Sequence, residues 1–366
     1  MPGRFSIGNV DASRHGPCVL FLARNEHGPM SELSPRPGVK QTSRHKGRDL
    51  RFWTISEVEQ PILLCRTILF FDRIAHPYGS APTSVSRSRQ MPEPSDVSKH
   101  YAHGDLTEAI RSGLTLQGKS MDTVTIDDLA PVDEFHIGGR RASEDFLDQL
   151  AFNAQMKVLD IGCGLGGPAR FVANRYGSQV TGIDLTREYV ETGNTLCRWV
   201  GLDKRIFLQE GSALALPFAE RSFDGAYMLH VGMNIEDKEK LADEVARVLR
   251  SGSLLGIYDV MSTGPGELAF PVPWATTAGL SAVANSDRYK SALQGAGFEI
   301  LAERNRRDFA LAFFADLRAK TAAADGPPPL GLHVLMGKNT PEKVQNMIDN
   351  ISRGHIAPVE LIARKR

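Results

Sequence analysis

Residues 159–167 read LDIGCGLGG, four glycines among nine residues, and they overlap the end of the apolar run KVLDI at 157–161. The run predicts a buried β-strand, and GPARFVANRY at 167–176 predicts the helix that follows it. Glycines at such a turn can adopt positive φ and let a ligand approach the backbone closely. A strand, a glycine-rich turn and a helix begin a βαβ unit, so the stretch indicates a parallel sheet with a ligand site at its carboxyl edge.

The alternation of strands and helices continues to the end of the chain. Further strands are predicted at 179–184, 205–210, 223–229, 253–261, 298–303 and 356–365. Helices are predicted between them at 186–201, 238–250, 287–296, 309–324 and from 341 onward. We therefore expect an α/β, Rossmann-like fold, with a seven-stranded, mostly parallel sheet, helices on both faces and an antiparallel last strand.

Residues 1–90 differ in composition from the rest of the chain. They hold 13 basic and 7 acidic side chains and show no sustained helical or alternating period. We expect a disordered extension, with Met91 as the natural start of the protein; a basic arm for nucleic acid is the alternative. Residues 91–150 are expected to form an N-terminal helical cover, and 151–366 the α/β domain. The proline- and glycine-rich segment at about 262–286 is unusually long, and we expect it to cover a substrate.

Whole-chain composition argues against several classes of function. Lysine plus arginine balance aspartate plus glutamate at 43 each, so no nucleic-acid partner is expected. The cysteines Cys18, Cys65, Cys163 and Cys197 form no C-x-x-C pair, so we expect neither a disulfide framework nor a metal site. The apolar stretch at 61–71 is too short to span a bilayer, and the N-terminus lacks a signal-peptide pattern. We therefore expect a cytoplasmic protein without a membrane span.

The glycine turn fits two cofactor templates. Gly162, Gly164 and Gly167 have the G-x-G-x-x-G spacing of a dinucleotide-binding turn. Counted from Asp160, the first three glycines have the D-x-G-x-G-x-G spacing of an S-adenosylmethionine site. Asp184, at the end of the second strand, can bind the hydroxyls of a ribose or cap the next helix, and both cofactors contain a ribose. The turn alone therefore leaves NAD and S-adenosylmethionine open.

The segment after the third strand favours one of the two cofactors. LPFAERSFD at 216–224 resembles a segment of the class I methyltransferases, in the ubiquinone and menaquinone methyltransferase-like group. Within that group, VSKHYAHGDL at 97–106 and APVDEFHIGGR at 130–140 are similar to N-methyltransferases of glycine, sarcosine or dimethylglycine. The resemblance covers roughly residues 95–366 and implies an enzyme that uses S-adenosylmethionine.

The resemblance also implies which residues hold the cofactor. Four residues of the glycine turn would lie along its methionine end: Gly162, Cys163, Gly164 and Gly167. Asp184 would bind the ribose, and Leu185 would lie beside the adenine. Three residues would hold the adenine edge, although the family commonly has an acidic residue at the second position: Gly211, Ser212 and Ala213. Three residues before the first strand would close over the methionine moiety, or pack there without touching it: Phe135, His136 and Gly138.

His230, at the end of the fourth strand, would lie near the sulfonium of the cofactor. Methyl transfer from a sulfonium is an in-line displacement, so the protein chiefly has to align the reacting atoms and exclude water. For an amine acceptor, His230 could act as the catalytic base, or it could be a buried group with its hydrogen bonds satisfied. Five residues are candidates for binding the methyl acceptor, and each could instead be structural: Tyr101, Asp259, Trp274, Arg288 and Tyr289.

These expectations combine into one leading hypothesis and two alternatives. The leading hypothesis is transfer of a methyl group from S-adenosylmethionine to a small molecule, possibly an amine such as glycine, sarcosine or dimethylglycine. The first alternative is a carbon or oxygen acceptor in a quinone or sterol-like precursor. The second is an NAD-dependent oxidoreductase. A monomer and a homodimer are both compatible with the sequence.

Overall fold

A computed structural model describes residues 100–366 with the exception of 102–103, 325, 327 and 338. The chain divides into two units, 1–81 and 82–366, and everything described here belongs to the second. The expected disordered extension at 1–90 lies outside the described residues, as do Cys18 and Cys65.

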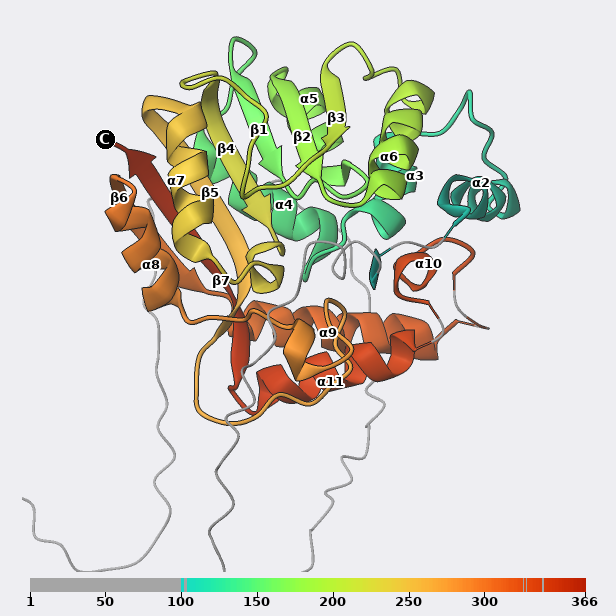
Figure 1. Ribbon diagram of the computed structural model, residues 1–366. Helices are drawn as coiled ribbons and strands as arrows, with labels where there is room; N and C mark the ends of the chain where they lie inside the picture. Colours follow the sequence, from blue (N-terminus) through green and yellow to red (C-terminus); the bar gives the residue numbers. More distant parts are fainter. Residues whose placement is uncertain (1–99, 102–103, 325, 327, 338) are drawn as a thin grey trace, which may run out of the picture. The chain divides into compact units, whose positions relative to one another are not determined.

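The domain is built on a seven-stranded sheet with the order β3-β2-β1-β4-β5-β7-β6 (Figure 1). Its strands are β1 Lys157–Ile161, β2 Gln179–Asp184, β3 Ile206–Glu210, β4 Phe223–Leu229, β5 Leu249–Ser262, β6 Phe298–Asn305 and β7 Ile356–Lys365. The first five strands pair in parallel, whereas β7 lies between β5 and β6 and is antiparallel to both. The expected fold class, including the antiparallel last strand, is confirmed.

Helices flank the sheet on both faces. They are α2 Leu106–Leu116, α3 Ile126–Asp133, α4 Gly139–Leu147, α5 Gly167–Tyr176, α6 Arg187–Trp199, α7 Lys238–Val248, α8 Ser286–Gly295, α9 Arg307–Ala322, α10 His333–Met336 and α11 Thr340–Ser352. Leu159 of β1 belongs to an apolar cluster with Leu241 of α7 and Leu293 of α8. Val158 belongs to a different cluster, with Phe146 of α4. Successive side chains of a strand point to opposite faces, so one short apolar run serves both cores.

Helices from both ends of the domain cover the carboxyl ends of the parallel strands. α2, α3 and α10 share one apolar cluster, which includes Ile110, Leu129 and Leu335. α9 and α11 share another, with Phe314 and Met347, and lie side by side below the sheet in Figure 1. This helical layer encloses the ligand side of the sheet.

The junction of α7 and β5 differs from the sequence-based expectation. A helix to residue 250 and a strand from 253 are expected, but α7 ends at Val248 and β5 begins at Leu249. The pairing of β5 with β4 shifts register at this point, and Gly252 adopts φ 84°. The irregular stretch is held by pairing with the neighbouring strand, which the helical period of this segment does not reveal.

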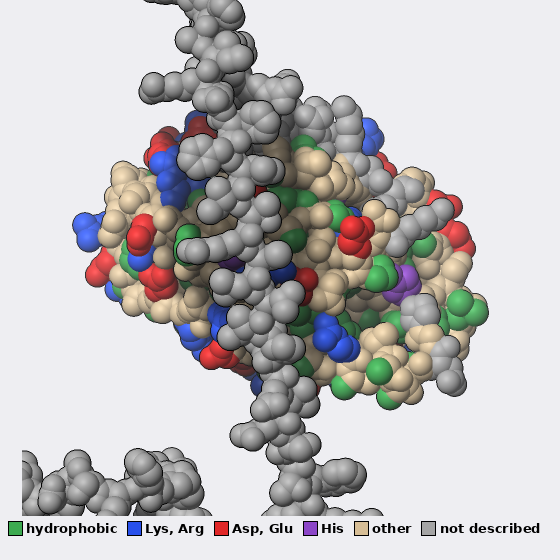
Figure 2. All heavy atoms as spheres, turned by 90° about the horizontal axis from the view of Figure 1, so that it is seen from below, with side chains coloured by type: hydrophobic (Ala, Val, Ile, Leu, Met, Phe, Trp, Pro, Cys, Tyr) green, Lys and Arg blue, Asp and Glu red, His purple; other side chains and the backbone are tan. Residues whose placement is uncertain are grey.

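The described residues show four further features that bear on function. None of their helices is long and apolar enough to cross a membrane. They contain no group of three histidine, cysteine, aspartate or glutamate side chains arranged to hold a metal ion. Acidic and basic side chains are interspersed on the face seen from below in Figure 2. Cys163 and Cys197 are buried free thiols.

Candidate functional site: a cavity at the carboxyl edge of the sheet

A cavity of about 1310 Å³ lies where the parallel strands end. The glycine turn and the ends of β2 and β4 form one side, and α9, α10 and α11 form the other. A wound parallel sheet places its ligand at this edge. Fourteen of the sequence-predicted site residues line the cavity: Tyr101, Phe135, His136, Gly138, Gly162, Cys163, Gly164, Asp184, Leu185, Gly211, Ser212, Ala213, His230 and Trp274. Four lie outside its lining: Gly167, Asp259, Arg288 and Tyr289.

The glycine turn exposes its backbone to the cavity. The N–H groups of Gly162 and Cys163 both donate to the carbonyl of Ile183 in β2, at 2.8 and 3.0 Å. Gly162 and Gly164 have φ of 70° and 52°, a region that favours glycine. A Cβ on Gly164 would meet nothing closer than the Tyr189 ring at 3.9 Å. The space beside Gly164 is therefore open to a ligand.

Asp184 connects the turn to the second strand and to the helix after it. One carboxylate oxygen accepts from the Gly164 N–H at 2.9 Å, and the other accepts from the Thr186 N–H at 2.8 Å. Burial raises the pKa of Asp184, and these two hydrogen bonds oppose the shift. The side chain thus bonds to the backbone at the start of α6 and also lines the cavity. Capping of the helix and binding of a ribose are therefore compatible roles for Asp184.

Asp160 also lines the cavity, although it is not among the residues expected to bind a ligand. It is buried at 2% exposure, and its Oδ2 has no hydrogen-bond partner among the described residues. Burial raises the pKa of this carboxyl to about 8. A cationic ligand group such as the ammonium of S-adenosylmethionine would satisfy the oxygen and restore its charge. The D-x-G-x-G-x-G spacing contains the signal, since it begins at this residue.

The loop after β3, where the sequence predicts the adenine edge, lines the cavity. Gly211 donates its N–H to the Asp184 carbonyl at 2.9 Å, and a Cβ there would lie 2.7 Å from Ile183 Cδ1. The Ser212 hydroxyl accepts from the Leu214 N–H at 3.1 Å. Its own proton remains available to donate, and the oxygen keeps a second lone pair, so Ser212 can still bond to a ligand in the cavity.

The N-terminal cover is fixed by hydrogen bonds. His136 Nε2 lies 3.1 Å from the Gly139 carbonyl and 3.1 Å from Ser143 Oγ, and burial lowers the pKa of His136 to about 4. Gly138 adopts φ 97°, and a Cβ there would lie 2.4 Å from a ring carbon of Phe309 in α9. His136 is therefore neutral, and Gly138 allows the cover to pack closely against α9.

His230 is a buried histidine with both ring nitrogens engaged. Nδ1 lies 3.2 Å from the Tyr258 carbonyl, and Nε2 accepts from the Ile137 N–H at 3.3 Å. Burial lowers its pKa to about 3, so the ring is neutral. One nitrogen donates and the other accepts, so no lone pair is left to take a proton from an acceptor molecule. This geometry favours the interpretation of His230 as a buried histidine with its hydrogen bonds satisfied over that of a catalytic base. The side chain links the N-terminal cover to the end of β4.

Gly167 serves helix packing rather than ligand binding. A Cβ at this position would lie 2.4 Å from the carbonyl oxygen of Asp133, the last residue of α3. Asp133 in turn accepts from Arg170 Nη2 at 2.6 Å, within the buried start of α5. The third glycine of the dinucleotide template therefore lets α3 approach α5, and it lies outside the cavity lining although the sequence places it at the methionine end of the cofactor.

Three of the acceptor-side candidates lie behind the cavity instead of in it. Tyr289 donates its hydroxyl to Asp259 Oδ2 at 2.6 Å, and burial raises the pKa of Asp259 to about 6. Arg288 pairs on the surface with Glu239 at 2.5 Å, so it is not placed to bind a substrate carboxylate in the cavity. These side chains connect α7, α8 and β5.

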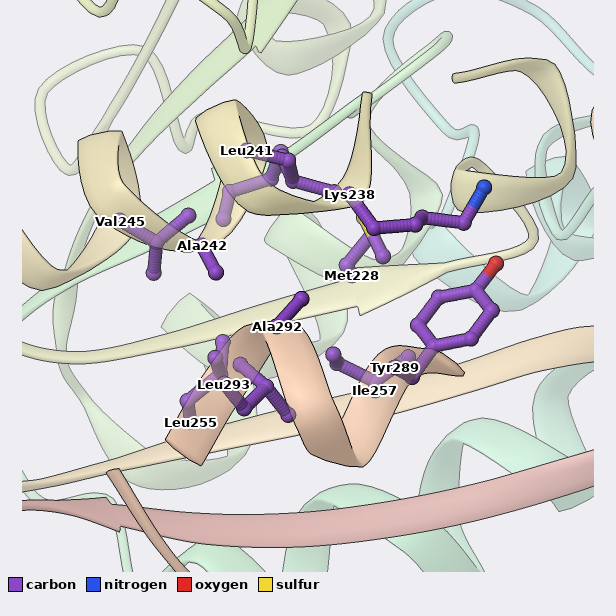
Figure 3. Close-up of a pocket in the computed structure, with 11 residues that line it drawn as sticks. Met228, Lys238, Leu241, Ala242, Val245, Leu255, Ile257, Tyr289, Ala292 and Leu293 are labelled. Atoms are coloured by element: carbon purple, nitrogen blue, oxygen red, sulfur yellow. The ribbon is translucent and has the colours of Figure 1, made fainter. Parts of the chain in front are cut away.

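Lys238 joins this group, although no motif in the sequence indicates it. Its ammonium donates to the carbonyls of Gly232 and Ala282, each at 3.0 Å, and to that of Ile235. It also lies 5.0 Å from the centre of the Tyr289 ring, and Figure 3 shows the two side chains extending toward each other from α7 and α8. The buried ammonium ties the turn after β4 to the segment at 262–286.

The side of the cavity opposite the glycine turn is apolar. Its residues come mainly from the turn after β4 and from α9, α10 and α11: Met233, Phe313, Phe314, Leu317, Leu335, Met336, Val344, Met347 and Ile348. None of them is recognisable as a site residue from the sequence, because an apolar stripe on a helix looks the same whether it faces a core or a ligand.

Comparisons with known proteins agree with this geometry. A family model described as "Methyltransferase domain" matches residues 159–257. The Streptomyces halstedii protein "Methyltransferase GfsG" is 30% identical over 177 residues, which are 48% of this chain and 64% of that protein. A sterol 24-C-methyltransferase of Gibberella zeae is 30% identical over 152 residues, 40% of each chain. The chain thus spans less than two thirds of the length of either of these relatives.

Solved structures share the fold. A Haemonchus contortus phosphoethanolamine N-methyltransferase 2 in complex with S-adenosyl-L-methionine has a TM-score of 0.56 at 19% identity, covering 70% of this chain and 60% of that one. A putative sarcosine dimethylglycine methyltransferase from Galdieria sulphuraria has a TM-score of 0.51 at 19% identity, covering 70% and 98%. At this identity the likeness concerns the fold alone.

The glycine turn and the two aspartates lie within or beside a segment that matches a known domain. Residues 159–257 are similar to the methyltransferase domain, and the relatives named above are methyltransferases. The match to the methyltransferase domain favours S-adenosylmethionine over NAD, the two cofactors that the glycine spacing leaves open.

Proposed function

We propose that the protein transfers the methyl group of S-adenosylmethionine to a carbon or oxygen atom of a large, mainly apolar small molecule. The observation that carries this proposal is the cavity of about 1310 Å³ with its apolar side on α9 and α11. Pockets for single drug-sized ligands commonly measure about 300–1,000 Å³. The cavity therefore has room for the cofactor and for a second molecule of comparable size.

The charges around the cavity support an apolar acceptor over an amino acid. A glycine-like acceptor carries a carboxylate, which an arginine would normally bind. Of the described residues lining the cavity, Arg140 and Arg318 are the arginines. Arg140 is already paired with Glu134 at 2.5 Å, and Arg318 is exposed on α9 and bonds to Gln345 at 3.1 Å. The proposal therefore adopts the carbon or oxygen alternative in place of the amine hypothesis.

The chemistry required of the protein is alignment and exclusion of water. S-adenosylmethionine supplies an activated methyl group, so no covalent enzyme intermediate is needed. His136 and His230 are neutral and hydrogen-bonded, and they fix the cover beside the end of β4. The buried apolar side would hold the acceptor against the cofactor in a medium poor in water, which favours displacement at the methyl group.

The test is methyl transfer from labelled S-adenosylmethionine to two sets of acceptors. One set contains sterols and tocopherol-like phenols; the other contains glycine, sarcosine and dimethylglycine. Turnover of at least one apolar acceptor and of none of the amino acids is expected. Turnover of the amino acids alone would refute the proposal.

A narrowed cavity provides a second, independent readout. Val344→Trp in α11 adds bulk to the apolar side, whereas Glu342→Trp adds the same bulk on the exposed part of the helix. Overpacking costs about 1–3 kcal/mol, so acceptor turnover should fall about tenfold or more in the first variant only. Affinity for S-adenosylhomocysteine should be the same in both. Equal turnover in the two variants would contradict a role of α11 in acceptor binding.

A further inference from the structure

Three polar side chains line the cavity near the cofactor turn: Tyr101, Tyr189 and Asn234. They come from the N-terminal cover, from α6 and from the turn after β4. Asn234 Nδ2 donates to the Tyr101 hydroxyl at 3.4 Å, and the rings of Tyr101 and Tyr189 lie 5.9 Å apart. We call this group the polar cluster.

Two atoms of the polar cluster have no hydrogen-bond partner among the described residues. These are Tyr189 Oη, on a side chain that is 96% buried, and Asn234 Oδ1, which is itself shielded from solvent. Buried polar atoms are nearly always paired in native proteins, and an unpaired one is costly. A ligand in the cavity is the natural partner for both atoms.

The chemistry of the two atoms defines the group they bind. Asn234 Oδ1 can only accept a hydrogen bond, whereas the Tyr189 hydroxyl can donate and accept. The Tyr101 hydroxyl receives the Asn234 amide proton, so its own proton is also free to donate. A carboxylate, which only accepts, would be repelled by Oδ1. A hydroxyl matches the cluster, because it donates to Oδ1 and accepts from a tyrosine.

The position of the cluster relates that hydroxyl to the reacting atoms. The Tyr189 ring is the nearest group to a Cβ built on Gly164, at 3.9 Å, and the Tyr101 ring packs edge to face with Phe135 at 6.3 Å. The cluster therefore lies between the cofactor turn and the N-terminal cover, at the cofactor end of an otherwise apolar acceptor side.

We infer that the acceptor carries a hydroxyl group and that the polar cluster binds it, with Asn234 and Tyr189 as specificity-determining residues. The acceptor is then an apolar molecule with an alcohol or phenol near the atom that takes the methyl group. This inference rests on the proposed function and adds a chemical feature of the substrate to it.

The experiment compares binding of alcohols with that of the matching hydrocarbons to the full chain saturated with S-adenosylhomocysteine. The probes are cholesterol with its 3-deoxy analogue, and dodecanol with dodecane. One well-placed hydrogen bond makes the alcohol of a pair bind about tenfold tighter to the wild-type protein. Asn234→Leu and Tyr189→Phe should each reduce this preference to about twofold or less, without changing hydrocarbon binding.

Tyr176→Phe is the matched control, since it deletes the same atom from a tyrosine that bonds to Asp148 away from the cavity lining. It should keep the full preference for the alcohol. An alcohol preference that survives in both Asn234→Leu and Tyr189→Phe would overturn the inference. A parallel loss of S-adenosylhomocysteine affinity in these variants would also overturn it, because the cluster would then bind the cofactor. Failure of every probe to bind would instead contradict the proposed apolar acceptor, and the inference with it.

Discussion

Replacing Asp160 with asparagine should change how the stability of the protein depends on pH. Asp160→Asn keeps the shape of the side chain and removes the ionisable group. Burial raises the pKa of Asp160 from 3.8 to about 8. A shift of about 4 pKa units, at 1.36 kcal/mol per unit, corresponds to about 6 kcal/mol between the two limits of pH.

The sign follows from which state loses its proton first. Above pH 3.8 the carboxyl ionises in the unfolded chain but stays protonated in the native protein until about pH 8. The unfolded state therefore binds fewer protons than the native state across this interval. The contribution of Asp160 to the free energy of unfolding consequently falls as the pH rises. Between pH 5 and pH 8 the loss is about 4 kcal/mol. Asp160→Asn lacks this contribution.

Urea unfolding at several pH values measures the effect. The difference in free energy of unfolding between wild type and Asp160→Asn should shift by about 4 kcal/mol from pH 5 to pH 8, in favour of the variant at the higher pH. Asp203→Asn, at an exposed position between α6 and β3, should run parallel to wild type. Parallel curves for Asp160→Asn and wild type would refute the description of Asp160 as a buried, unpaired acid.

Three further substitutions test other parts of the site. Gly138→Ala should lower the melting temperature, measured by thermal unfolding, more than Gly139→Ala does. Both glycines have positive φ, 97° and 50°, but only a Cβ on Gly138 would collide with α9. Lys238→Met should destabilise the protein by about 3 kcal/mol and speed limited proteolysis within 262–286, since the Lys238 ammonium bonds to three carbonyls. Lys240→Met, at an exposed position, should have neither effect. Unchanged proteolysis of 262–286 in Lys238→Met would contradict the role of Lys238 in holding this segment. His230→Gln should lower methyl transfer without altering its pH profile, because the histidine pKa of about 3 leaves no titration near neutrality; loss of an acidic limb would restore the base hypothesis.

The sheet could be predicted closely because its signals are local. The strands 157–161, 179–184, 223–229 and 356–365 have the bounds expected from the sequence. The first is followed by Gly162, the second ends at Asp184 and the last ends at Lys365, so the local sequence indicates these boundaries. The start of β5 could not be read in this way, because its first residues are held by pairing with β4 across a register shift.

The same distinction, between local sequence signals and tertiary packing, applies to the residues of the candidate site. Gly162, Gly164 and Asp184 could be placed because a motif fixes their backbone positions, and the strand order brings them together. Gly167 belongs to the same motif, yet its neighbour is the carbonyl of Asp133, which only the packing of α3 determines. Arg288 follows a helix start that is easily predicted, but its surface partner on α7 turns the side chain away from the cavity.

The cavity has a cofactor half, formed by the glycine turn and the strand ends, and an acceptor half, formed mainly by α9, α10 and α11. The relatives are informative about the first half more than about the second. The family match covers residues 159–257, which include the glycine turn, Asp184 and the end of β4. α9 and α11, which carry most of the apolar side of the cavity, lie beyond it. The cofactor half can therefore be shared across proteins that methylate different atoms, while the acceptor half varies with helices that the shared segment does not contain. For this reason the acceptor has to be inferred from the volume, the apolar side and the unpaired polar atoms of the cavity itself.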